Sequence, residues 1–178
     1  CDLTDVVAVE RLIDDNTCCL FLEVMSNPQL EVVDVRALAE IAHRHSIPVI
    51  ADTTLIPFTQ FSAKDLGIDL EVVSSTKYIS GGATSLGGLV IDYGTFPSIG
   101  KRLLNEMLFN LGAYMTPQVA YMQTLGLETL DVRYRAQAGN ALELAQRLRT
   151  LKPIHKVNYV GLEDNPYHQL AVRDRKSV

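Results

Sequence analysis

Two residues able to do chemistry follow apolar runs of the sequence. Asp52 comes directly after the run Ile47–Ala51, and Lys77 closes the polar segment SSTK that follows the run Leu70–Val73. In an open parallel sheet, ligands bind beyond the carboxyl ends of the strands. Asp52 and Lys77 are 25 residues apart, close to one βαβ unit of roughly 30 residues. We therefore expect both side chains to reach one crevice.

A lysine beside hydroxyls and a carboxylate favours an aldehyde cofactor over a metal ion. A protonated lysine is a poor metal ligand, but in a desolvated site its pKa falls and the free amine forms a Schiff base with pyridoxal phosphate. The hydroxyls and amides around Lys77 are suited to hold the phosphate. Asp52 would keep the pyridine nitrogen protonated, so that the ring withdraws electrons. These residue types predict pyridoxal phosphate as cofactor and no metal.

Each of these residues also has an ordinary structural explanation. A lysine after a strand is usually a solvated surface residue, and Asp followed by Thr commonly caps a turn. Other cofactor sites have little support, because the loop GGATSLGG has neither the GxGxxG spacing nor a P-loop lysine, and the turn at 24–28 has no glycine for a nicotinamide-binding domain. His43 and His45 would face different sides of a helix and do not form a metal pair.

The elements that must position these residues read as an α/β fold. Helical spacing covers residues 5–13 and 34–45, and Asp34 is placed to cap the second helix. The runs Cys18–Glu23, Ile47–Ala51 and Leu70–Val73 read as strands of a parallel sheet, and the first is typical of a strand buried on both faces. The pattern predicts repeated βαβ units.

The second half of the chain changes character. Another strand is expected at Leu89–Ile91, with helices at 99–111 and 117–127. Helical spacing then continues for about six turns over Glu128–Leu151, and the alternation at His155–Tyr159 resembles a first strand of a further domain. We divide the chain into residues 1–127, part of a cofactor-binding large domain, and residues 128–178, a linking helix and the start of a C-terminal domain.

Composition excludes several classes of protein. The 178 residues are 47% apolar and 21% charged, typical of a packed globular chain. A net charge of −5 without a basic block argues against nucleic-acid or anionic-membrane partners. The three cysteines are expected to be reduced, and we expect neither a transmembrane segment nor a signal peptide. We expect a cytoplasmic protein.

The residues around these motifs resemble a known family. The segment "SNPQLEVVDVRALAEIAHRHSIPVIADTTLIPF…VVSSTKYISGGATSLGGLVID" is similar to the pyridoxal-phosphate enzymes of cysteine and methionine metabolism, which include cystathionine γ-synthase, cystathionine lyases, methionine γ-lyase and O-acetylhomoserine sulfhydrylase. The later segments "YMTPQVAYMQTLGLETLDVR" and "VNYVGLEDNPYHQLA" resemble its linking helices and the start of its C-terminal domain. The motif TSLGG at 84–88 looks most like the O-acetylhomoserine sulfhydrylase branch.

The resemblance implies roles for individual residues. Lys77 corresponds to the Schiff-base lysine, which is the catalytic residue, and Asp52 to the carboxylate that pairs with the pyridine nitrogen. Four further residues are implied to contact the cofactor: Asn27 near its ring oxygen, Ser74 and Thr76 at its phosphate, and Thr54 against its ring. The chain departs from the family at Thr53, where Asn is common, at 81–83, where Gly-His-Gly is common, and at 136–137, where Arg-His is common.

The resemblance also implies fold and function. We expect a three-layer α/β/α, mostly parallel sheet of the fold-type-I large domain, and γ-replacement or elimination on a sulfur amino acid or activated homoserine, with sulfide or a thiol as nucleophile. Methionine γ-lyase, cystathionine γ-synthase and cystathionine lyase activities are the alternatives, and a homodimer or homotetramer is the implied assembly. Family chains are more than twice as long, so we expect a fragment that shows no turnover when it is isolated. A non-catalytic binding or interaction domain is the rival from another class.

Overall fold

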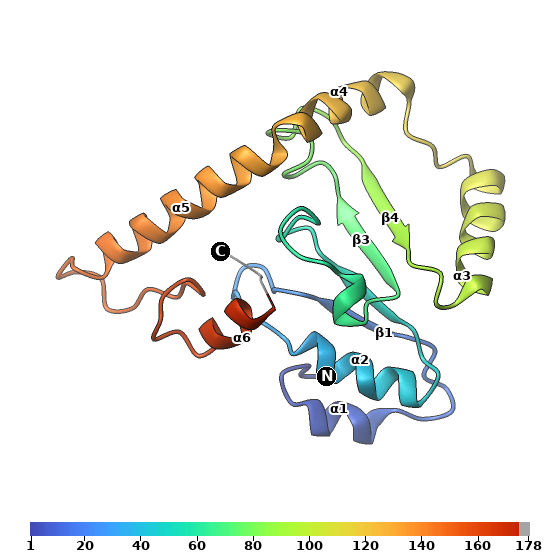
Figure 1. The fold of residues 1–178 in the computed structure, drawn as a ribbon, viewed down its shortest axis with the longest axis horizontal. Helices are drawn as coiled ribbons and strands as arrows, with labels where there is room; N and C mark the ends of the chain where they lie inside the picture. Colours follow the sequence, from blue (N-terminus) through green and yellow to red (C-terminus); the bar gives the residue numbers. More distant parts are fainter. Residues whose placement is uncertain (175–178) are drawn as a thin grey trace.

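A mixed four-stranded sheet forms the centre of the chain (Figure 1), for which a computed structural model describes residues 1–174. The strands lie in the order β1 (Leu20–Glu23), β2 (Val49–Asp52), β3 (Leu70–Ser74) and β4 (Gly88–Asp92). β1, β2 and β3 are parallel to one another, and β4 pairs antiparallel with β3. The sheet is therefore mostly parallel, and the predicted α/β class is confirmed.

Helices occupy most of the remaining regular structure. In chain order they are α1 (Val6–Leu12), α2 (Val35–Arg44), the 3₁₀ helix η1 (Lys64–Leu66), α3 (Pro97–Arg102), the π-helical η2 (Leu103–Phe109), α4 (Pro117–Glu128), α5 (Leu130–Leu148) and α6 (His168–Arg173). The helix predicted at 34–45 is confirmed, and the Asp34 side chain accepts a hydrogen bond from the Ala37 amide at its start. None of the helices within residues 1–174 is both long and apolar enough to cross a membrane.

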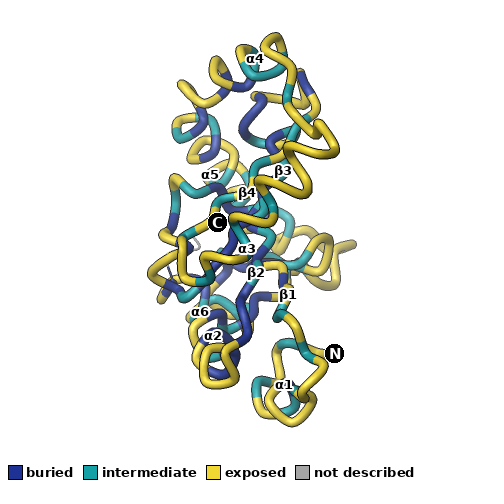
Figure 2. Tube along the Cα trace, turned by 90° about the vertical axis from the view of Figure 1, so that its right-hand side faces the viewer, coloured by how far each residue is buried: buried dark blue, intermediate teal, exposed yellow. Residues whose placement is uncertain are grey.

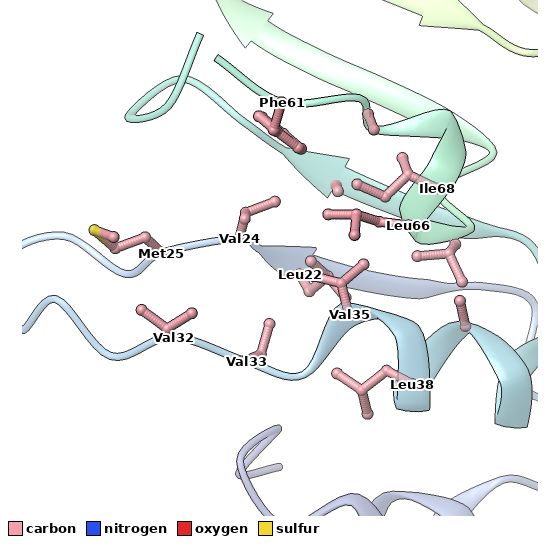
Figure 3. Packing of buried hydrophobic residues seen from close by; sticks show 14 of the residues in the cluster. Leu22, Val24, Met25, Val32, Val33, Val35, Leu38, Phe61, Leu66 and Ile68 are labelled. Atoms are coloured by element: carbon pink, nitrogen blue, oxygen red, sulfur yellow. The ribbon is translucent and has the colours of Figure 1, made fainter. Parts of the chain in front are cut away.

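The main core lies between one face of the sheet and α2. Strand register places Leu22, Ala51 and Glu71 side by side on this face. Figure 3 shows side chains of β1, α2 and η1 gathered in the cluster. In Figure 2, burial concentrates around the strands, whereas much of α1 and α4 is exposed. The position of this core leaves the other face of the sheet to carry the strand-end residues Asp52 and Ser74.

That other face is partly open, which corrects one expectation. The run Cys18–Glu23 was predicted to be buried on both faces, but β1 is an edge strand and its Phe21 is 58% exposed. Val90 of β4 is 56% exposed as well. Apolar composition alone did not distinguish an edge strand from a central one.

Two helices of the second half are confirmed, and other expectations about elements were wrong. The helices predicted over 117–127 and Glu128–Leu151 are α4 and α5, and the boundary between them lies at Thr129. The crossover from β2 to β3 contains only η1 and no α-helix, so the second unit is not a full βαβ. Residues 155–159 do not form a strand. The division of the chain at 127/128 stays a prediction.

The C-terminal part of the described chain returns to the sheet. α5 leads away from the strands, and α6 lies back beside α2 (Figure 1). Arg173 of α6 forms an ion pair with Asp34, with 2.8 Å between Nη2 and Oδ1. The helix cap of α2 is therefore also an anchor for the end of the described chain.

Candidate active site

Polar residues end three neighbouring strands at one edge of the sheet. Glu23 ends β1, Asp52 ends β2 and Ser74 ends β3. Glu23 and Asp52 are partners in the strand register. Because the three strands are parallel, their carboxyl ends meet at this edge, where ligands bind in open α/β sheets. The structure thus brings the candidates together as the spacing predicted.

A cavity of about 340 Å³ opens at this edge. It contains five of the six residues singled out in the sequence, and its lining consists of Glu23, Met25, Asn27, Asp52, Thr54, Leu55, Ser74, Lys77 and Tyr78. Lys77 is exposed, whereas the sequence argument had placed the amine in a desolvated site. Within the described chain the cavity is an open cleft with one amine, two carboxylates and several hydroxyls on its walls.

Hydrogen bonds donated by backbone amides connect the cleft residues. The Asp52 Oδ1 atom accepts a hydrogen bond of 2.8 Å from the Thr54 amide. Thr54 Oγ1 accepts one of 2.8 Å from the Ser74 amide, and the Lys77 amide donates to the Ser74 carbonyl oxygen at 3.4 Å. Asp52, Thr54, Ser74 and Lys77 are therefore linked in sequence across the ends of β2 and β3.

Thr76 lies apart from the cavity lining. Its hydroxyl accepts a hydrogen bond of 3.0 Å from the Gly87 amide and donates one of 3.2 Å to the Gly87 carbonyl oxygen. The Thr76 amide also donates to the Gly87 carbonyl oxygen. Thr76 thus joins the two ends of the loop that carries Lys77, and its phosphate contact stays a prediction.

The cleft also contains residues that sequence reasoning missed. Glu23 was read only as the last residue of a strand, although its position at a strand end was the available signal. Its Oε2 atom accepts a hydrogen bond of 3.4 Å from the Asn27 amide. No sequence pattern marked Tyr78 or Leu55 as cleft residues, because both are held in position by contacts with α5, which is distant in the chain.

Tyr134 of α5 supports the wall formed by Leu55 and Tyr78. Its hydroxyl donates a hydrogen bond of 3.1 Å to the Leu55 carbonyl oxygen, and its ring packs edge-on against Tyr78 with 5.3 Å between centroids. Burial, followed by the influence of Tyr78, raises the pKa of Tyr134, so the phenol remains a hydrogen-bond donor. α5 therefore helps to shape the cleft.

The donor set of the cleft fits pyridoxal phosphate. An amine is available for the aldehyde in Lys77, and a carboxylate for the pyridine nitrogen in Asp52. Asn27, Thr54 and Ser74 offer an amide and two hydroxyls around them. The combination of a lysine with hydroxyl and carboxylate groups suits an aldehyde cofactor better than a cation, because a protonated amine repels cations.

Comparison with known proteins identifies relatives along the whole chain. The family model described as Cys/Met metabolism PLP-dependent enzyme matches residues 1–178. Canavanine γ-lyase from Pseudomonas canavaninivorans is 38% identical over 97% of this chain and 42% of its own length. The chain thus spans less than half the length of this curated relative.

Solved structures give the same answer. O-acetylhomoserine sulfhydrylase from Wolinella succinogenes superposes with a TM-score of 0.86 at 40% identity, covering 98% of this chain and 54% of that one. A Campylobacter jejuni structure with N'-pyridoxyl-lysine-5'-monophosphate has a TM-score of 0.91 at 32% identity and covers 97% of this chain and 49% of that one. The cleft, the fold and these matches agree: the chain belongs to the Cys/Met metabolism family of pyridoxal-phosphate-dependent enzymes.

Proposed function

We propose that this chain provides the lysine-bearing part of an enzyme that acts at the γ carbon of an activated homoserine, with sulfide or a thiol as nucleophile. The observation that carries the proposal is the cleft in which Lys77, Asp52, Asn27, Thr54 and Ser74 meet. The O-acetylhomoserine sulfhydrylases among the similar proteins support this substrate class.

The cleft residues divide the work of binding and proton transfer. Bound pyridoxal phosphate would withdraw electrons from the bonds at the amino acid's α carbon. Lys77 Nζ is the one amine among the lining residues, and we assign it two tasks: it holds the cofactor's aldehyde and moves protons at the substrate's α and β carbons. Asp52 holds the pyridine nitrogen in its protonated form. Ser74 and Thr76 are assigned to the phosphate, Asn27 and Thr54 to the ring.

A γ-elimination is the second candidate. Canavanine γ-lyase and L-methionine γ-lyase are among the relatives, the latter 32% identical over 98% of this chain. The same proton transfers serve both outcomes, because the two reactions diverge only after the γ substituent has left. Addition of a thiol gives replacement, whereas water gives a keto acid and ammonia.

Exposed apolar residues support the proposed homodimer or homotetramer. They lie on η2, just after it and on α4, and include Leu104, Met107, Phe109, Leu111, Tyr121 and Leu125. Exposed apolar surface of this kind is typical of protein interfaces. The expected cytoplasmic location stays a prediction.

One assay separates these possibilities. The full-length protein that contains this chain is incubated with pyridoxal phosphate, dialysed, and scanned for visible absorbance of bound cofactor. It is then given a panel of homoserine esters with and without sulfide. Homocysteine that requires sulfide supports replacement, and keto acid with ammonia supports the lyase. Bound cofactor without turnover, or no bound cofactor, would favour the non-catalytic binding domain. Lys77→Ala serves as the control.

A further inference from the structure

A carboxylate is enclosed in the main core behind the cleft. Glu71 is the second residue of β3 and has 0% exposure. Two hydroxyl groups donate to its two oxygens: Thr53 Oγ1 to Oε1 at 2.5 Å, and the Tyr93 hydroxyl to Oε2 at 2.7 Å. Burial, with the Glu71 hydrogen bond as the next cause, raises the pKa of Tyr93. Tyr93 therefore remains a donor to this carboxylate.

Thr53 connects this carboxylate to the cleft. It is 1% exposed and lies between Asp52 and Thr54, which both line the cleft. Successive side chains of a strand point to opposite faces, and the register pairs Glu71 with Ala51, two residues before Thr53. Thr53 and Glu71 thus share the core side of the sheet, whereas Asp52 lies on the other side.

Both the backbone and the side chain of Thr53 are bound to β3. Its amide donates to the Val72 carbonyl oxygen at 3.0 Å, and its hydroxyl donates to Glu71. The two residues that flank Thr53 are also bound to each other, because the Asp52 carboxylate accepts a hydrogen bond from the Thr54 amide. A rotation of the backbone at Thr53 would therefore move the Asp52 carboxylate and break its bond to Thr54.

Stability alone does not explain a carboxylate at this position. Removing a charge from water costs several kcal/mol, and well-packed apolar residues often replace buried polar groups without loss of stability. The strand partners of Glu71 are Ala51 and Ile91, so the sheet itself would accept an apolar residue here. What such a residue would lose is the acceptor for the hydroxyls of Thr53 and Tyr93. The hydrogen bond from Thr53 indicates another role for the carboxylate: it holds Thr53, the residue between Asp52 and Thr54, in place.

We propose that Glu71 is a positioning residue for Asp52, and that it acts through the hydroxyl of Thr53 from the core side of the sheet. The link to the cofactor rests on the proposed function, since Asp52 matters there only if it meets the pyridine nitrogen. The position of Asp52 itself does not depend on the cofactor. The two parts of the inference are therefore measured separately.

The test compares two variants that remove one hydroxyl each from the same carboxylate. Thr53→Val keeps the branched shape and removes the donor next to Asp52. Tyr93→Phe removes the other donor, away from the cleft, and is the matched control. Amide hydrogen exchange of Thr54 in the cofactor-free full chain reports the bond to Asp52, and the dissociation constant of pyridoxal phosphate reports the cleft.

We expect Thr53→Val to accelerate exchange of the Thr54 amide and to weaken cofactor binding by about tenfold. Tyr93→Phe should leave both unchanged, and Thr53→Ser, which retains a hydroxyl, should behave as the wild type. Equal effects of the valine and phenylalanine variants, or no effect of the valine variant, would overturn the inference. If Thr53→Val does not fold, Thr53→Ala is compared in the same way.

The exchange measurement also separates this inference from the proposed function. Faster exchange in Thr53→Val together with no cofactor binding by the wild type would uphold the positioning of Asp52 and refute the cofactor role. Cofactor binding by the wild type together with unchanged Thr54 exchange in Thr53→Val would uphold the cofactor role and refute the positioning of Asp52.

Discussion

Gly126 is the point at which α4 touches the segment after Lys77. A Cβ atom at this position would overlap the Ile79 carbonyl oxygen and lie 2.9 Å from the Ser80 carbonyl carbon. The neighbouring atoms belong to the backbone and cannot rotate away. α4 would have to retreat by roughly 1 Å to restore ordinary contact distances. Gly126→Ala therefore tests how closely this helix packs beside the lysine loop.

The expected loss of stability follows from two opposing effects. Overpacking in a tight contact costs about 1–3 kcal/mol, and a backbone neighbour places this case near the upper end. Replacing a helical glycine by alanine gains at most about 1 kcal/mol. The net destabilisation should thus be about 2 kcal/mol, which lowers the urea midpoint by about 1 M for a slope typical of small proteins.

Gly139→Ala is the matched control. Gly139 lies in α5, is exposed, and has no atom within 4 Å of the position a Cβ would take, apart from the nearby backbone of its own helix. This variant should gain up to about 1 kcal/mol, because only the helix propensity changes. Urea unfolding of both variants, followed by circular dichroism, gives the comparison. Equal stability of the two would refute the close packing of α4 against residues 79–80.

Three further predictions concern the site and its supports. Lys77→Ala should lose the borohydride-trapped bond to pyridoxal phosphate while Lys64→Ala keeps it; peptide mapping that placed the cofactor on Lys64 would contradict the assignment. Asp52→Asn should retain cofactor but lower turnover by about 10²-fold or more, and wild-type turnover would disprove the role of the charge. The Arg173 hydrogen bond, outweighing burial, lowers the pKa of Asp34 from its ordinary 3.8, so the ion pair stabilises the fold above that pH and is lost as pH falls through the lowered value. Asp34→Asn should therefore remove part of the acid-induced loss of stability in urea titrations below pH 3.8, and an unchanged pH dependence would count against this pair.

Local signals in the sequence were sufficient for the elements that carry the cleft. The apolar runs that end at Asp52 and Ser74 predicted two neighbouring strand ends, and Asp34 marked the start of α2. These features depend on residues close together in the chain. They therefore located Asp52, Ser74 and Lys77 at one edge before any tertiary contact was known.

Other features depend on contacts between distant segments. The apolar run of β1 gave no sign that this strand lies at the edge of the sheet with Phe21 exposed. The sequence assigned Thr76 only to the phosphate and gave no sign of the hydrogen bonds between its hydroxyl and Gly87, eleven residues later in the chain. Glu71 was read as part of an apolar strand, because its partners Thr53 and Tyr93 lie on other elements.

The antiparallel pairing of β4 with β3 determines which parts of the connecting loop, residues 75–87, can change in sequence or length. Residues 75–87 leave and rejoin the same strand pair, and the hydrogen bonds between Thr76 and Gly87 close the loop at its base. Lys77 lies beside this closure, whereas residues 81–84 at the tip are exposed. Exposed loop tips tolerate substitutions and insertions. The tip can therefore take insertions without displacing the amine, whereas substitutions are restricted at Gly81 and Gly82, whose φ angles are positive.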